Sequence, residues 1–301
     1  MTRRLVALAT LFLIALPGRA ADRLRVVATT ADLGAVATAV GGDAVEVTVL
    51  ARPSEDPHFV DAKPSFIRTL NQADALVEGG AALEAGWLPP LLEGARNPRI
   101  ATGAPGRILG STGIALRDVP TQLDRSLGDV HPFGNPHYLL DPVNAKTVAR
   151  TIADGLCGVA HDRCDTFTAG AQRFADTIDA RLVGWQSTLA RARGAKVITY
   201  HKDLDYFAAR FGLEVVGTLE PKPGIPPSPS HLAELVPRMQ ADHVRVILIE
   251  PFRDRATPDF IAGKTGATVL VVPLMPDGKE ATDYPGVIDH AVRQIAGALS
   301  S

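Results

Sequence analysis

Apolar and polar positions follow two alternating patterns along most of the chain. Short β-branched runs at residues 24–30, 45–50 and 75–78 are typical of strands. Residues 32–40, which end at two glycines, and the segment that starts at Pro64 are predicted helices. Because strands and helices keep alternating, the pattern predicts parallel α/β layers.

The hydrophobic pattern changes at residues 165–192, where apolar residues recur near helical spacing. If this helix is continuous, it has about 28 residues and a length of roughly 40 Å, which is long for a globular helix. A helix of this length between two α/β regions would act as a rigid connector. Its apolar positions are Phe167, Phe174, Ile178, Leu182, Trp185 and Leu189.

The second half of the chain repeats the order of the first. A strand at 195–200, a helix at 204–211 and a strand at 214–219 are followed by strands at 244–250 and 267–272 and a helix at 288–299. The fold prediction is therefore α/β, with two Rossmann-like lobes of mostly parallel sheets joined by one long rigid helix. We place the lobes at residues 21–160 and 194–301 and the linking helix at 161–193.

The first twenty residues have the pattern of a secretion signal. Arg3 and Arg4 precede an apolar run at residues 5–16, and Gly18 and Ala20 supply small residues for cleavage. The run is too short for a membrane-spanning helix, although an N-terminal anchor is the alternative interpretation. We expect the mature protein to be soluble and located in the periplasm.

Charge and cysteine content narrow the function classes. With 31 Lys and Arg against 33 Asp and Glu, no excess of charge indicates nucleic acid or an anionic membrane surface as a partner. Cys157 and Cys164 could form a disulfide after export, which we favour, or stay reduced on adjacent helical turns. Their spacing does not match the Cys-x-x-Cys knuckle of a metal site.

Three histidines far apart in the sequence occupy the same kind of position, a loop of the predicted α/β layers. They are His58, His137 and His201, and Pro57 and Pro136 stiffen the backbone before the first two. Ligands of α/β sheets collect beyond the carboxyl ends of strands, so these loops can converge. Neutral imidazole suits zinc, copper, iron or nickel.

The motifs around these histidines, residues 56–59, 135–142 and 199–201, together with residues 248–251, are similar to those of a known family. The chain resembles the zinc and manganese receptors of bacterial ABC importers, the ZnuA/TroA-like solute-binding proteins. The resemblance covers nearly the whole mature chain. It implies a metal bound between two lobes, with little domain closure because the linking helix is stiff.

Carried over residue by residue, the resemblance implies that His58, His137 and His201 are metal ligands. The family usually adds an aspartate from a late loop, for which Asp277 is the choice here, with Glu250 or water as substitutes. A histidine at the third position, where manganese receptors often carry a carboxylate, favours Zn(II). His131 precedes the second ligand and is either an auxiliary capture ligand or a solvated loop residue.

The sequence therefore predicts a monomeric periplasmic zinc receptor that is not an enzyme. Its expected partner is the membrane permease of a zinc ABC importer, and a metallochaperone is a further candidate. A manganese or iron receptor, a surface adhesin and a zinc hydrolase with Glu55 or Glu250 as general base are the alternatives. The hydrolase is disfavoured because no His-Glu-x-x-His motif is present.

Overall fold

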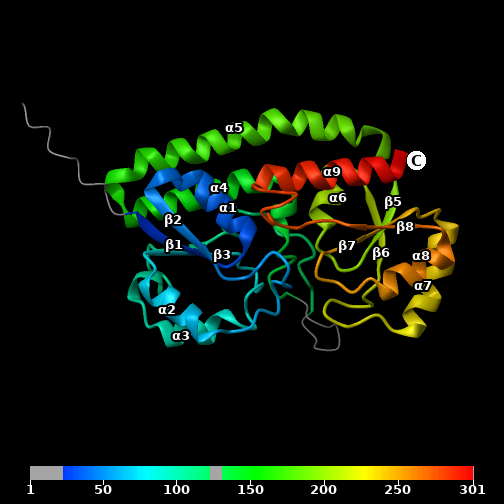
Figure 1. The fold of residues 1–301 in the computed structure, drawn as a ribbon, viewed down its shortest axis with the longest axis horizontal. Coiled ribbons are helices and arrows are strands. Elements are labelled where there is room, and N and C mark those ends of the chain that lie inside the picture. The colour runs from blue at the N-terminus through cyan, green and yellow to red at the C-terminus, as the bar shows by residue number, and fades with distance from the viewer. Residues whose placement is uncertain (1–22, 123–130, 301) are drawn as a thin grey trace, which may run out of the picture.

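The computed structural model describes residues 23–122 and 131–300, so the predicted signal sequence at residues 1–20 lies outside the described residues. Two four-stranded parallel sheets form the molecule (Figure 1). The first has the order β2-β1-β3-β4 and the second the order β6-β5-β7-β8, so both follow the same winding. The predicted fold class is confirmed. The strands are β1 (Leu24–Ala28), β2 (Val45–Val49), β3 (Ala75–Glu78), β4 (Arg107–Leu109), β5 (Lys196–Thr199), β6 (Glu214–Thr218), β7 (Val246–Ile249) and β8 (Thr268–Val271).

The N-terminal lobe, built on β1 to β4, has helices on both faces of its sheet. Alternate residues of β1 point to opposite faces: Val26 and Ala28 pack toward α1 (Ala31–Gly41) and α4 (Pro142–Val159). Val27 packs on the other side, with α2 (Pro64–Gln72) and α3 (Leu88–Ala95). Burial on both faces explains why the central strands β1 and β3 are mostly apolar, whereas the edge strand β2 alternates between apolar and polar residues.

The C-terminal lobe, built on β5 to β8, repeats this arrangement. Ile198, Ile247 and Ile249 pack against α7 (Pro229–Ala241) and α8 (Ala256–Thr265). The opposite face packs against α6 (Asp205–Phe211) and α9 (Tyr284–Ser300). The residues on this second face belong to the same apolar core as α1 and α4, so one core continues from lobe to lobe.

The long helix α5 (Cys164–Thr188) runs across both lobes (Figure 1). Its 25 residues give a length of roughly 37 Å. The helix is slightly shorter than the predicted linker, because the short 3₁₀ turns His161–Arg163 and Ala190–Ala192 flank it. At Gly170 a side chain would lie 2.0 Å from the Val40 carbonyl oxygen, so glycine permits the close approach of α5 to α1.

A disulfide joins Cys157 near the end of α4 to Cys164 at the start of α5, as favoured from the sequence. It fixes the turn at which the chain enters the long helix. Among the described residues, no helix has the length and apolar character that a membrane span needs.

Candidate metal site

Three histidines from separate loops meet between the lobes. His58 follows β2, His137 immediately precedes the turn Tyr138–Leu140, and His201 follows β5. One ring nitrogen from each lies within 4.8 Å of the other two. The ring centroids are 5.1 Å (His58 to His137), 5.3 Å (His58 to His201) and 5.4 Å (His137 to His201) apart. Nitrogens that bind zinc tetrahedrally at about 2.0 Å lie roughly 3.3 Å apart, so small movements would bring these rings onto one ion.

The loop of His58 is fixed to its own lobe. The Trp87 indole N–H donates to the Pro57 carbonyl at 2.9 Å, and both Trp87 and Pro57 are buried. Proline at position 57 also restricts the backbone next to the ligand. His58 therefore has a defined backbone position before any metal is bound.

The loop of His137 is fixed to both lobes through Asn135. The side-chain carbonyl of Asn135 accepts from the His137 backbone N–H at 3.0 Å, and its amide donates to the Lys202 carbonyl at 2.7 Å. The Tyr206 hydroxyl donates to the Asn135 carbonyl at 2.8 Å. Because Lys202 follows His201 directly, these bonds tie the second and third histidines together.

Two carboxylates orient two of the imidazoles. His58 Nδ1 lies 2.7 Å from Asp56 Oδ1, and His201 Nδ1 lies 2.8 Å from Glu220 Oε2. An ionised carboxylate only accepts hydrogen bonds, so a neutral ring in either pair carries its proton on Nδ1 and presents the Nε2 lone pair to the cluster. Although burial alone would raise it, the hydrogen bonds from His58 and the nearby Arg253 keep the pKa of Asp56 below its usual value.

Burial holds the innermost imidazole, His137, in its neutral form. Burial, followed by the charges of His58 and His201, lowers the pKa of His137 well below its usual value. The His137 Nε2 atom is buried and has no hydrogen-bond partner within the described part of the chain. A buried, unpaired acceptor of this kind is what a metal ligand looks like without its ion.

His131 lies against the cluster and not in solvent. Its Nε2 is 3.1 Å from His58 Nε2, and its ring also hydrogen bonds with the backbone of Ala82. Burial, followed by the charges of His58 and His201, lowers the pKa of His131 to about 4. His131 is therefore neutral at pH 7 and close enough to share an ion with His58.

Asp277, the predicted fourth ligand, is not part of the histidine group. Its side chain is exposed and Oδ1 accepts the backbone N–H groups of Lys279, Glu280 and Ala281 at 2.9 to 3.1 Å. Those hydrogen bonds, led by the one from Lys279, lower the pKa of Asp277. The Asp-Gly pair thus closes a turn here.

Glu250, the substitute considered for Asp277, is also outside the histidine group, and its Oε1 atom is buried without a hydrogen-bond partner among the described residues. It is 1 % exposed and its Oε2 lies 3.3 Å from Arg253 Nε. Sequence reasoning did not identify Asp56, Glu220 or Arg253 as parts of the site. The position of Asp56 two residues before His58 was a usable signal, whereas Glu220 lies 19 residues from His201 and is brought to it only by the pairing of β5 with β6.

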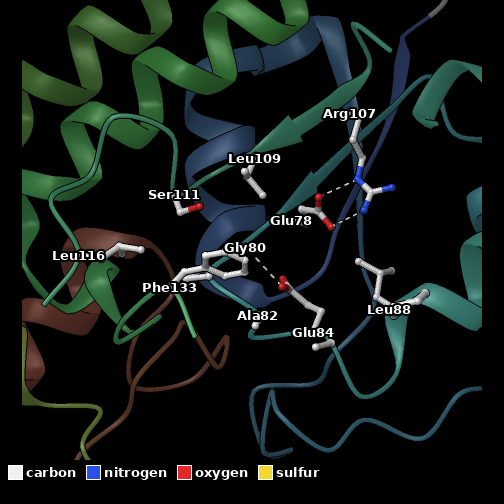
Figure 2. A pocket seen from close by; sticks show the side chains of 13 residues that line it. Glu78, Gly80, Ala82, Glu84, Leu88, Arg107, Leu109, Ser111, Leu116 and Phe133 are labelled. Atoms are coloured by element: carbon white, nitrogen blue, oxygen red, sulfur yellow. Dashed lines mark hydrogen bonds and ion pairs between the residues drawn. The ribbon is translucent and has the colours of Figure 1, made fainter. Parts of the chain in front are cut away.

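A separate cavity of about 430 Å³ lies in the N-terminal lobe, lined mainly by apolar side chains. Figure 2 shows Phe133, Leu116 and Leu109 around it, with the Glu78–Arg107 ion pair at one side. None of the three clustered histidines lines it. Its buried Glu84 accepts hydrogen bonds from the Thr29 hydroxyl and the Gly79 and Gly80 N–H groups, and burial raises the pKa of Glu84 to about 7.

Comparison with known proteins agrees with this geometry. Residues 26–298 match the sequence model of the family ZnuA, described as "Zinc-uptake complex component A periplasmic". Zinc-binding lipoprotein AdcA of Streptococcus pneumoniae (strain TIGR4) is 25% identical over 97% of this chain, and the match covers 59% of AdcA. High-affinity zinc uptake system protein ZnuA of Paracoccus denitrificans is 25% identical over 98% of this chain and 96% of its own length.

Solved structures share the fold. A zinc-bound deletion mutant of ZnuA superposes with a TM-score of 0.79 at 23% identity, covering 93% of this chain and 99% of that one. The solute-binding protein FpvC of Pseudomonas aeruginosa in complex with Mn²⁺ superposes with a TM-score of 0.78 at 22% identity, covering 93% and 99%. Proteins with this fold have therefore been crystallised with different divalent ions.

Proposed function

Because this chain belongs to the ZnuA family of periplasmic zinc-uptake components, we propose that it is a periplasmic, high-affinity receptor that delivers Zn(II) to the membrane permease of an ABC importer. The observation that carries this proposal is the convergence of His58, His137 and His201. Three imidazole nitrogens close to one point form a site for a cation, and three imidazoles suit zinc better than the harder manganese ion.

The proposed ligands are His58, His137 and His201, with Asp277 as the predicted fourth. Asp277 would have to release its three backbone hydrogen bonds to reach an ion in this cluster. His131 is the alternative that needs less movement, since its Nε2 is already 3.1 Å from His58 Nε2. A water molecule could also complete the coordination.

The proposal also covers the oligomeric state and the partners of the protein. A receptor of this kind acts as a monomer, docks on the permease through both lobes and binds no nucleic acid, and a metallochaperone would be a second route of loading. The proposed protein is not an enzyme. Of the two alternative general bases for a hydrolase, Glu55 accepts hydrogen bonds from the Arg52 backbone N–H at 2.9 Å and from its guanidinium at 2.8 Å, and Glu250 pairs with Arg253 through Oε2.

The test is a competition titration of the chelator-stripped mature chain with Zn²⁺ and with Mn²⁺. We expect one tight zinc site, with manganese at least about a thousandfold weaker. Comparable or tighter manganese binding would contradict the assignment of zinc, and the absence of tight binding of both ions would contradict the receptor function.

The same titration identifies the fourth ligand. Asp277→Ala and His131→Ala are compared with His290→Ala, a histidine on α9 outside the cluster that serves as the control. Weaker zinc binding in the Asp277 variant alone supports the predicted ligand. Weaker zinc binding in the His131 variant alone would identify His131, and not Asp277, as the fourth ligand. No change in either variant would indicate that water is the fourth ligand.

A further inference from the structure

Arg253 contacts the carboxylate partners of two of the clustered histidines. It follows β7 in the C-terminal lobe, in a turn closed by its own N–H and the Glu250 carbonyl at 3.1 Å. Its side chain is only 18% exposed, and its guanidinium lies over the Tyr200 ring, 4.9 Å from the centroid. The cation is thus held from one side by an aromatic face.

Three carboxylates surround this guanidinium. Its nitrogens lie 3.4 Å from Asp56 Oδ2, 3.3 Å from Glu220 Oε1 and 3.3 Å from Glu250 Oε2. The arrangement differs from that of Arg107, which makes two 2.7 Å hydrogen bonds to a single carboxylate, that of Glu78. A bidentate pair is the stronger geometry for one ion pair. Arg253 instead divides its ion pairs among carboxylates from both lobes.

The carboxylate oxygens divide their partners in the same way in each lobe. Asp56 uses Oδ1 for the His58 ring and Oδ2 for Arg253. Glu220 uses Oε2 for the His201 ring and Oε1 for Arg253. A continuous chain of contacts therefore runs from His58 in one lobe, through Arg253, to His201 in the other.

This chain has a physical consequence for the imidazoles. A carboxylate whose outer oxygen is free can rotate and leave the ring without a fixed acceptor, and the ring can then adopt either tautomer. With the outer oxygens of Asp56 and Glu220 held by one guanidinium, both inner oxygens stay on Nδ1 and both Nε2 atoms stay available. Glu250 contacts the guanidinium from a third direction and helps to keep it in place.

We infer that Arg253 is a positioning residue of the metal site, which orients His58 and His201 together by holding their two carboxylate partners across the lobe boundary. The inference rests on the proposed function, in which these histidines bind zinc. A competing role is electrostatic repulsion of the divalent ion, and the two roles predict opposite changes in affinity when the guanidinium is removed.

The first measurement is zinc affinity and release in Arg253→Gln and Arg253→Lys. We expect Arg253→Gln to bind zinc about tenfold or more weakly, mainly through faster release to a chelator, as for other outer partners of metal ligands. Arg253→Lys should be intermediate, because an ammonium keeps the charge but not the planar fork. The matched control is Arg210→Gln, which removes another Arg–Asp pair between the lobes, at 2.7 Å to Asp141, without touching a clustered histidine.

The second measurement is made on the zinc-free protein. Nitrogen-15 NMR of the imidazoles should show His58 and His201 as the Nδ1–H tautomer in the wild type and as mixed tautomers in Arg253→Gln. If Arg253→Gln does not fold, the tautomers of His58 and His201 are measured in Arg253→Lys instead. A wild-type protein that fails to bind zinc contradicts the proposed function, while these spectra still test Arg253. Wild-type tautomers in the variant, unchanged zinc release, or tighter zinc binding would each overturn the inference.

Discussion

The two lobes have the same sheet order, but the buried carboxylates Glu84 and Glu220 have different kinds of partners. In the N-terminal lobe, Glu84 is 4% exposed and is held by a hydroxyl and two backbone N–H groups, with no ion pair among the described residues. In the C-terminal lobe, Glu220 is equally buried but contacts Arg253 and the His201 ring. Burial raises the pKa of Glu84 to about 7, since no cation offsets its desolvation.

This difference lies in the groups that surround each carboxylate. Glu84 lies by the cavity shown in Figure 2 and closes the turn after β3, where backbone donors suffice. Glu220 instead lies 2.8 Å from the His201 Nδ1 atom, and its other oxygen pairs with the guanidinium of Arg253 at 3.3 Å. The two lobes thus share a topology, and the chemical differences between them lie in the loops at the ends of the strands.

The largest loss of zinc affinity is expected when a histidine of either lobe is removed. We expect His201→Ala and His58→Ala each to weaken zinc binding by more than about a hundredfold, beyond the loss caused by outer partners. Competition titration against a chelator measures the effect, with His243→Ala as the control outside the cluster. Retention of wild-type affinity in His201→Ala would place the metal site within the N-terminal lobe alone.

A smaller effect should distinguish Glu84 from the carboxylates of the C-terminal lobe. Its pKa is raised to about 7 from 4.5, so between these pH values the folded protein keeps a proton that the unfolded chain has released. Stability should therefore fall as pH rises through this window, by about 3 kcal/mol from this group. In Glu84→Gln this contribution to the pH dependence of the unfolding free energy should disappear. The lost hydrogen bonds would change the stability by the same amount at every pH.

Chemical denaturation of zinc-free protein at several pH values measures that slope. The exposed Glu93→Gln on α3 is the control, and its slope should equal that of the wild type. An identical slope in Glu84→Gln would mean that Glu84 is ionised in the folded protein and that the contrast between the lobes is wrong.

The two outer carboxylates allow a finer comparison. Asp56→Asn and Glu220→Gln should each weaken zinc binding by roughly 10- to 100-fold. The loss should be larger for Glu220→Gln, because the Glu220 side chain is 5% exposed against 15% for Asp56, so water replaces it less readily. The reverse order, measured by the same titration, would show that the N-terminal lobe determines the geometry of the site.

The smallest expected effect is a change of shape on zinc binding. One apolar core continues through both lobes and includes buried residues of α5, which resists hinge motion. Small-angle X-ray scattering should therefore give the same radius of gyration with and without zinc. A measurable contraction would show that the lobes move as separate bodies despite the helix.

The sequence determined the elements of this protein because their causes are local. Apolar runs at 24–30 and 195–200 became β1 and β5, and helical spacing over 165–192 became α5, since burial periodicity is written in adjacent residues. The motifs around His58, His137 and His201 likewise identified the histidines that the structure brings together.

Only the tertiary structure decided what completes the site. Glu220 reaches His201, and Arg253 reaches Asp56 across the lobe boundary, through contacts that depend on how the two sheets are placed. The same placement brings His131 to His58 and leaves Asp277 in a turn of its own loop. Long-range pairs between carboxylates, cations and imidazoles have no periodic signature, because their energy depends on distance and burial and not on sequence separation.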